Sequence, residues 1–218
     1  MAHKHAHATK QGAPETRGHV IHWARLYELL TKLPGMSGAA IRRQTVDRAD
    51  VRPGEKVLDI GCGPGALALL AKERAGPDGE VHGIDPSPEM INLARKKAAA
   101  GGGVRFQTGV AEELPFPDAS FDLVLSSLML HHLPDDLKPQ ALKEVARVLK
   151  PGGRLFAVDM SGGGPWYWRL VSAAIRHRLP KDYIQRLTGM MSAARLVPEV
   201  VESGQSQYAF IRARKKES

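Results

Sequence analysis

Residues 57–65 read Val-Leu-Asp-Ile-Gly-Cys-Gly-Pro-Gly, and this stretch decides the fold. Apolar residues suited to a buried strand lead directly into three glycines at alternate positions. One acidic residue, Asp59, lies inside the apolar run, where an uncompensated charge is costly. Glycines let the backbone turn tightly and approach a ligand, because no Cβ intervenes. Residues 66–75 have helical character, so the stretch predicts the first strand–loop–helix unit of a nucleotide-binding α/β domain.

Length and composition describe an ordinary globular chain. Its 218 residues, with 43% hydrophobic and 25% charged residues, suit one domain with a full core. No apolar run approaches the roughly 18 residues that span a bilayer, and we expect no secretory signal, because the first residues carry His and Lys without an apolar stretch. The single cysteine, Cys62, fits a reducing cytoplasm. Its place in the glycine loop favours a small tolerated side chain over a nucleophile.

The net charge of +8 is unevenly distributed. Residues 165–218 contain ten Lys or Arg and four Asp or Glu, whereas residues 56–164 contain twelve and fourteen. A basic flank can attract anionic substrates, a membrane surface or nucleic acid. A solvated face with a basic tail is the simpler interpretation.

The sequence divides into a tail and one domain that contains the glycine loop. We predict a disordered tail over residues 1–18. Its alternating histidines can bind a metal weakly, but a flexible tail is the favoured interpretation, and no metal site is expected. Residues 19–218 are expected to form one domain. It would have a helical cap over 19–52, a cofactor-binding core over 53–160, and substrate-side helices with a C-terminal β-hairpin over 161–218.

Strand and helix alternate within the core. This rhythm predicts right-handed crossovers and a doubly wound, mostly parallel sheet. The expected strands are 56–62, 80–85, 104–110, 121–127 and 154–160, followed by a hairpin of 197–202 and 207–214. The expected helices around them are 39–50, 65–75, 88–100, 138–149 and 181–195.

The glycine spacing distinguishes between nucleotides. A dinucleotide loop has the form G-x-G-x-x-G, whereas Gly61, Gly63 and Gly65 make G-x-G-x-G. That spacing suits a compact methionine-like group better than a pyrophosphate. Asp85 ends the second expected strand, where its carboxylate can accept both hydroxyls of a ribose. An N-cap role is the alternative for Asp85, although Ser87 can fill that role instead.

These motifs resemble class I S-adenosylmethionine-dependent methyltransferases, in particular the ubiquinone/menaquinone-biosynthesis group. The resemblance extends over residues 56–160. It implies S-adenosyl-L-methionine as the cofactor and a Rossmann-like seven-stranded sheet whose last strand is antiparallel. Besides residues 57–65, it rests on the segments 83–87, 111–116, 121–124, 131–132 and 149–153.

The resemblance also implies a set of cofactor-binding residues. The methionine part would be held by Asp59, Gly61, Gly63 and Pro64, and the ribose by Asp85. The remaining positions are Pro86, Met90 and the backbone N–H of Ala111 at the adenine, and Ser127 beside the transferring methyl group.

One departure from the family pattern concerns the adenine. Relatives usually have Asp before Ala111, contacting the adenine amino group, whereas this chain has Val110. Either Glu112 or Glu113 takes over that contact, or adenine recognition is weaker than usual.

Candidate groups for the chemistry lie outside the glycine loop. His131 and His132 follow the fourth strand and could act as a base if the acceptor loses a proton. They could instead pack or orient their loop. Tyr27 is a candidate lid residue or a core residue. Trp166 begins an aromatic and basic segment that could contact the acceptor, rest on a membrane, or pack on the sheet.

The favoured function is a cytoplasmic methyltransferase acting on a small molecule, either quinone-like or lipid-like. Three alternatives remain. A cofactor-binding protein without methyl transfer is suggested by Val110, and a nicotinamide-dependent oxidoreductase is disfavoured by the glycine spacing. The sequence argues against a nucleic-acid methyltransferase, because no Asn/Asp-Pro-Pro-Tyr-like segment follows the fourth strand. Peripheral membrane contact and the oligomeric state stay open.

Overall fold

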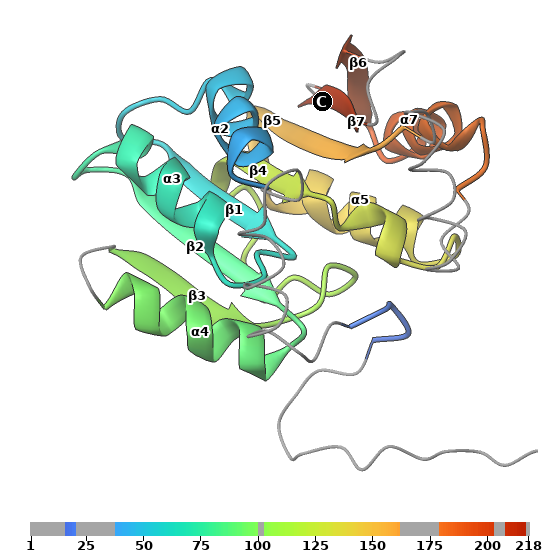
Figure 1. Ribbon diagram of the computed structural model, residues 1–218. Helices are drawn as coiled ribbons and strands as arrows, with labels where there is room; N and C mark the ends of the chain where they lie inside the picture. The colour runs from blue at the N-terminus through green and yellow to red at the C-terminus, as the bar shows by residue number, and fades with distance from the viewer. Residues whose placement is uncertain (1–15, 21–37, 100–102, 162–178, 203–207, 217–218) are drawn as a thin grey trace, which may run out of the picture.

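The computed structural model describes residues 16–20, 38–99, 103–161, 179–202 and 208–216. They form one seven-stranded sheet in the order β3-β2-β1-β4-β5-β7-β6, with helices on both sides (Figure 1). The strands are β1 (Lys56–Ile60), β2 (Glu80–Asp85), β3 (Val104–Thr108), β4 (Phe121–Ser127), β5 (Leu149–Met160), β6 (Leu196–Glu202) and β7 (Tyr208–Lys215). The helices are α2 (Gly38–Ala49), α3 (Ala66–Ala75), α4 (Pro88–Ala98), α5 (Lys138–Val148) and α7 (Tyr183–Ala193), with a 3-10 turn η1 (Leu130–His132).

The strand directions confirm the predicted topology. Strands β1 to β5 run parallel, while β7 is antiparallel to both β5 and β6. The order reverses between β1 and β4, so the helices after these strands leave on opposite faces. Ligands of doubly wound sheets bind at such a switch point, outside the carboxyl ends of the strands.

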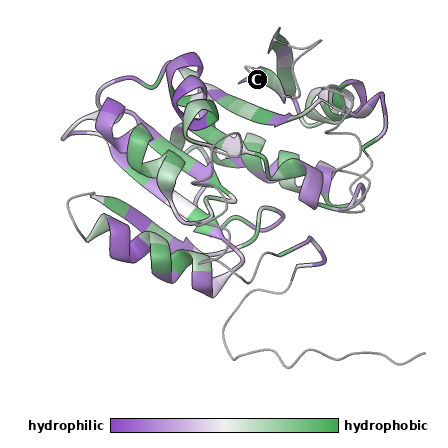
Figure 2. Cartoon of the chain, in the orientation of Figure 1, coloured by the Kyte–Doolittle hydropathy of each residue, from purple (hydrophilic) through white to green (hydrophobic). Residues whose placement is uncertain are grey.

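The sheet separates two hydrophobic cores. Helices α2, α3 and α4 cover one face, and α5 and α7 cover the other (Figure 1). Neighbouring residues of β1 face opposite ways, with Val57 in the first core and Leu58 in the second. Burial on both faces explains why the central strands read as continuous apolar runs. Hydrophobic colour accordingly follows β5, whereas α4 mixes both colours (Figure 2).

Strand β5 begins earlier than expected. The sequence predicts a turn over 150–153, but Leu149 already pairs with Phe121 before the register shifts to Arg154 opposite Leu123. Gly152, with φ of +71°, lies within this irregular stretch. The predicted turn is therefore an irregularity inside the strand, which lets β4 and β5 pair on both sides of it.

The N-terminal expectations are only partly covered. Residues 16–18 belong to the predicted tail, yet Thr16 donates to Glu112 and Arg17 pairs with Asp136. His19 donates its backbone N–H to the His132 carbonyl over 3.0 Å. This short segment thus contacts the carboxyl edge of the sheet. Tyr27 and Trp166 lie outside the described residues.

Candidate cofactor site and active site

The glycine loop leaves β1 at the carboxyl edge of the sheet. Gly61, Gly63 and Gly65 have φ of +66°, +52° and +80°, a region that costs other residues about 1–2 kcal/mol. A Cβ on Gly61 would lie 2.2 Å from Cγ of Met129, so that side chain packs directly on the loop. A Cβ on Gly63 would meet no atom of the described residues within 4 Å. The tip of the loop therefore borders open space, as a ligand-binding loop requires.

Asp59 is the buried charge beneath this loop. It is 1% exposed, and its Oδ2 has no hydrogen-bond partner among the described residues. Burial, followed by the neighbouring charge of Asp85, raises the pKa of Asp59 to about 8, against a smaller lowering by a hydrogen bond from the Ala68 backbone. A positively charged ligand group would compensate this carboxylate and satisfy its second oxygen.

Asp85 connects the loop to helix α4. Its Oδ2 accepts the N–H of Gly63 and its Oδ1 that of Ser87, both over 2.9 Å. The N-cap role belongs to Ser87, whose hydroxyl accepts the N–H of Met90 over 3.3 Å. Because a carboxylate has about four acceptor positions, Asp85 retains capacity for the hydroxyls of a ribose.

The surroundings of Cys62 do not favour a nucleophilic thiolate. It is 7% exposed, and burial raises the pKa of its thiol well above the usual value, as do the charges of Asp59 and Asp85. A thiolate is therefore disfavoured at neutral pH. The side chain fills space against β2, since a Cβ on Gly83 would lie 3.0 Å from its Sγ.

The loop after β3 carries the candidate adenine contacts. Val110 is 5% exposed and forms an isolated bridge with Glu113, whose side chain is exposed. Glu112 instead turns inward: Oε1 accepts the Thr16 hydroxyl, and Oε2 is buried without a hydrogen-bond partner among the described residues. Of the two glutamates, Glu112 is the one positioned beside the site.

Helix α5 fixes this loop in place. Glu144 accepts the N–H of Leu114 over 2.8 Å and is paired with Arg147. Arg147 donates to the carbonyls of Leu114 and Phe116 over 2.9 and 2.8 Å. These bonds satisfy backbone groups of the irregular segment after β3. Helix α5 therefore helps to hold Glu112, which belongs to that segment, in position.

The two histidines have different surroundings. The backbone N–H of His131 donates to Oδ2 of Asp159 over 3.0 Å, and its Nδ1 contacts Oδ1 of the same carboxylate. His132 stacks on His19, with ring centroids 5.6 Å apart. The two rings are neighbours, with centroids 4.1 Å apart. The contact with the buried carboxylate of Asp159 therefore distinguishes the surroundings of His131.

Asp159 was missed by reasoning from sequence. It lies near the end of β5 and is fully buried. The signal was available, because Asp159 interrupts an apolar run just as Asp59 does. What the sequence could not indicate is the partner, since His131 lies 28 positions earlier.

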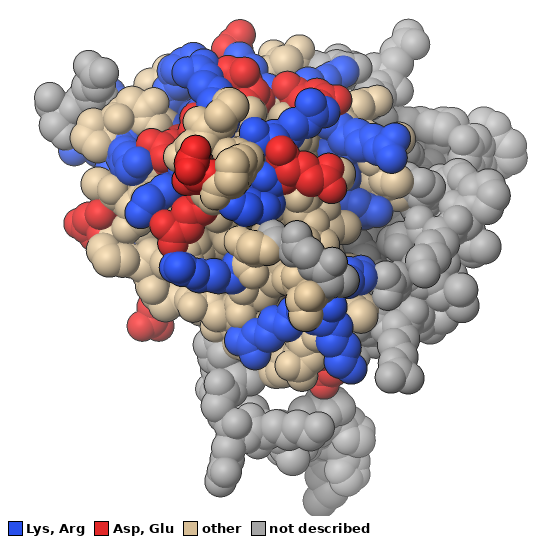
Figure 3. All heavy atoms as spheres, turned by 90° about the vertical axis from the view of Figure 1, so that its left-hand side faces the viewer, with Lys and Arg blue, Asp and Glu red and all other residues tan. Residues whose placement is uncertain are grey.

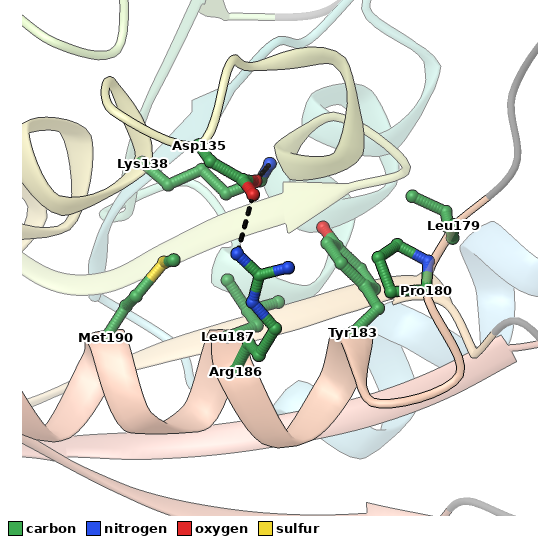
Figure 4. A pocket seen from close by; sticks show the side chains of 8 residues that line it. All are labelled: Asp135, Lys138, Leu179, Pro180, Tyr183, Arg186, Leu187 and Met190. Carbon is green, nitrogen blue, oxygen red and sulfur yellow. Dashed lines mark hydrogen bonds and ion pairs between the residues drawn. The ribbon is translucent and has the colours of Figure 1, made fainter.

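The other predicted cofactor residues lie around the same edge. Pro64, Pro86 and Ser127 are half-buried, whereas Met90 and Ala111 are buried. Two hollows lie elsewhere, one of about 40 Å³ between α5 and α7 (Figure 4) and one of about 320 Å³ between α2 and α3. The glycine loop and the buried carboxylates are therefore the features that mark the candidate site.

Known proteins share both the sequence and the fold. A family model described as "Methyltransferase domain" matches residues 57–153. A demethylmenaquinone methyltransferase from Thermus thermophilus is 39% identical over 180 residues, which cover 81% of this chain and 80% of that protein. This chain belongs to the S-adenosylmethionine-dependent methyltransferases. A demethylmenaquinone methyltransferase from Listeria monocytogenes is 38% identical over 142 residues, 64% of this chain and 59% of that protein.

Solved methyltransferase structures support the fold. A SAM-dependent methyltransferase from Aquifex aeolicus has a TM-score of 0.70 at 22% identity, covering 87% of this chain and 98% of that one. Phosphoethanolamine N-methyltransferase 2 from Haemonchus contortus, crystallised with S-adenosyl-L-methionine, also has a TM-score of 0.70, at 18% identity. It covers 89% of this chain and 57% of that one. Family membership decides against the oxidoreductase hypothesis.

The residues of this methyltransferase fit S-adenosyl-L-methionine. The cofactor carries a sulfonium and an ammonium, which suit the unpartnered oxygen of buried Asp59. The open space at Gly63 and the remaining capacity of Asp85 suit a methionine and a ribose. Within the described ranges, no group of His, Cys, Asp or Glu could hold a metal, and no helix could cross a membrane.

Proposed function

We propose that this methyltransferase acts on a small, apolar acceptor with a quinone-like ring. The observation that carries the proposal is the 39% identity to the Thermus demethylmenaquinone methyltransferase, which extends over 80% of that protein. The chain spans about three fifths of the Listeria relative. A lipid-like acceptor is the neighbouring alternative, because both share a largely apolar surface.

We also propose which residues contact the cofactor. We assign the methionine part to Asp59, Gly61, Gly63 and Pro64, and the ribose to Asp85. The support is the buried, unpartnered oxygen of Asp59 and the open tip of the loop. The adenine is assigned to Pro86, Met90, Ala111 and Glu112, and the methyl side to Ser127.

Methyl transfer requires mainly geometry from this protein. When bound, S-adenosyl-L-methionine supplies an activated methyl group, which the acceptor attacks in line as the electron pair returns to sulfur. Holding both reactants in that geometry can supply about 7–11 kcal/mol of the barrier. A base contributes where the attacked acceptor must lose a proton. His131 and His132 are the candidates, and the contact with Asp159 favours His131.

We also assign the enzyme to the cytoplasm, with peripheral contact to a membrane that holds its acceptor. The support is the buried single thiol and the basic composition of residues 165–218. On the side of the molecule that lies to the left in Figure 1, Lys and Arg are interleaved with Asp and Glu (Figure 3). Ion pairs such as Arg74–Asp47 lie there. This mixed surface does not suit a nucleic-acid backbone.

The test is transfer of a labelled methyl group to a demethylated quinone with a short side chain. We expect labelled product from the wild-type protein and loss of both cofactor binding and product in Asp85→Asn. Asp78→Asn is the matched control, because Asp78 is exposed in the turn before β2. Cofactor binding without product across quinone and lipid acceptors would leave a binding protein as the function.

A further inference from the structure

A buried polar network lies behind His131. Asp159 accepts from four donors: the backbone N–H and Nδ1 of His131, the hydroxyl of Tyr183 over 2.9 Å, and the N–H of Met160 over 2.8 Å. Asp159 is 0% exposed and Tyr183 4%. A carboxylate is the one side chain that only accepts, so this set of donors matches it fully.

We propose that Asp159 and Tyr183 are positioning residues for methyl transfer, which hold His131 with Nδ1 toward Asp159 so that Nε2 takes the acceptor's proton. This inference rests on the proposed function. A histidine that donates through Nδ1 to a carboxylate must exchange protons through Nε2. The acceptor forms its new bond to the methyl group, the electron pair of the broken S–C bond goes to sulfur, and the released proton goes to Nε2.

The position of His131 supports a role beyond packing. It lies in η1, directly after β4, and β4 pairs with β1, from which the glycine loop emerges. Met129, two residues before His131, packs on Gly61 of that loop. The histidine and the cofactor loop therefore share one edge of the sheet, which is where the two reactants of a methyl transfer must meet.

The backbone before η1 is strained. Leu128 has φ of +54°, and its N–H donates to the Val158 carbonyl over 2.8 Å. A leucine in this region costs about 1–2 kcal/mol. Such strain persists where the surroundings determine the conformation, and it is concentrated at functional sites. Here the bonds from Leu128 to Val158 and from His131 to Asp159 both fix η1 to the end of β5.

Other ionisable groups lie around the network, and their charges also act on the His131 imidazole in a pH experiment. His132 lies beside His131, and Lys138 of α5 lies 5.6 Å above the Tyr183 ring. Lys138 is paired with Asp135 over 2.7 Å. Figure 4 shows Tyr183 projecting from α7 toward this pair. Burial raises the pKa of Tyr183, and the Asp159 charge adds to the effect, so its hydroxyl stays a donor.

The experiment compares pH profiles of methyl transfer to the demethylated quinone for three variants. Asp159→Asn removes the negative charge, which makes the imidazole less basic. We expect kcat to fall by about 10–100-fold. The acidic limb of the profile, where the rate rises with pH as the His131 base loses its proton, should move to lower pH. Tyr183→Phe removes one hydrogen-bond donor from Asp159. The carboxylate then interacts more strongly with the imidazole, so the acidic limb of this variant should move to higher pH. Met190→Leu is the control, because Met190 lines the same hollow as Tyr183 and has an apolar side chain. It should leave the acidic limb unchanged.

A second measurement reads the geometry directly. Nitrogen NMR of the His131 ring in the wild type is expected to show Nδ1 protonated and Nε2 unprotonated above the imidazole titration. The Nε2-protonated form would overturn the proposal, as would matching pH limbs in Asp159→Asn and the wild type. A wild type without methyl transfer would count against the proposed function instead, while the NMR result still reports on positioning. A misfolded Asp159→Asn leaves Tyr183→Phe and the NMR measurement to decide.

Discussion

At the scale of single residues, two glycines allow the cost of backbone strain to be measured separately from the loss of a ligand contact. Gly63 and Gly152 both have positive φ, and among the residues that the structure describes a Cβ on either would meet nothing within 4 Å. We expect Gly63→Ala and Gly152→Ala to lower the free energy of unfolding by a similar amount, about 1–2 kcal/mol. Only Gly63→Ala should also weaken cofactor binding, at least tenfold by calorimetry. Equal cofactor affinities in the two variants would place the cofactor away from this loop.

The inward glutamate can be tested against its neighbour. Glu112→Gln removes the charge of a carboxylate whose Oε2 is buried, while Glu113→Gln alters an exposed side chain. Calorimetry with S-adenosyl-L-methionine should show a loss of about 1–3 kcal/mol for Glu112→Gln, the usual cost of an unmatched buried polar group. Glu113→Gln should bind like the wild type. The reverse ranking would assign the adenine contact to Glu113.

Asp59 makes the ligand-free protein sensitive to pH. Its pKa is about 8 in the fold, against an ordinary value of 3.8, so between these values the folded state binds more protons than the unfolded state. The free energy of unfolding therefore falls as pH rises toward 8, by up to about 1.4 kcal/mol per pH unit from this group. In Asp59→Asn that contribution disappears. Urea unfolding from pH 5 to 8.5 should give the variant the flatter profile, and parallel profiles would refute the role of burial.

At the scale of elements, one buried arginine ties α2 to β5. Arg154 is 8% exposed, donates to the Ala49 carbonyl over 3.1 Å, and pairs with Glu55 through two bonds of 2.7 and 2.9 Å. Arg154→Leu leaves Glu55 unpaired, so we expect a loss of about 3–5 kcal/mol in chemical denaturation. Arg52→Leu breaks an exposed pair with Asp50 and should cost under about 1 kcal/mol. Similar losses of stability in the two variants would mean that the Arg154 contacts between α2 and β5 do not stabilise the fold.

Most elements could be predicted from sequence because local signals agreed with the fold. Strands over 80–85 and 121–127 and the antiparallel hairpin have bounds close to those expected. The start of β5 was mispredicted, since Pro151 and Gly152 signal a turn and only the pairing partner in β4 reveals the strand. The cofactor loop was predictable because its glycines and Asp59 are contiguous. The Asp159–His131 contact was not, because it depends on strand order rather than on spacing.

At the scale of the whole molecule, the cofactor should act as part of the fold. The loop, Asp85 and the turn after β4 come from separate elements of one sheet, so a ligand that contacts all three stabilises the folded state. At 100 times its dissociation constant it should add about 2.7 kcal/mol. For a domain of this size that corresponds to a rise in Tm of roughly 5–10 °C. Scanning calorimetry with S-adenosyl-L-methionine should show the shift, and NADH at the same concentration should not. Because Asp85→Asn removes a bond that ties the loop to α4, its shift should be smaller than that of Asp78→Asn. A shift with NADH alone would mean that the early third glycine does not select the nucleotide.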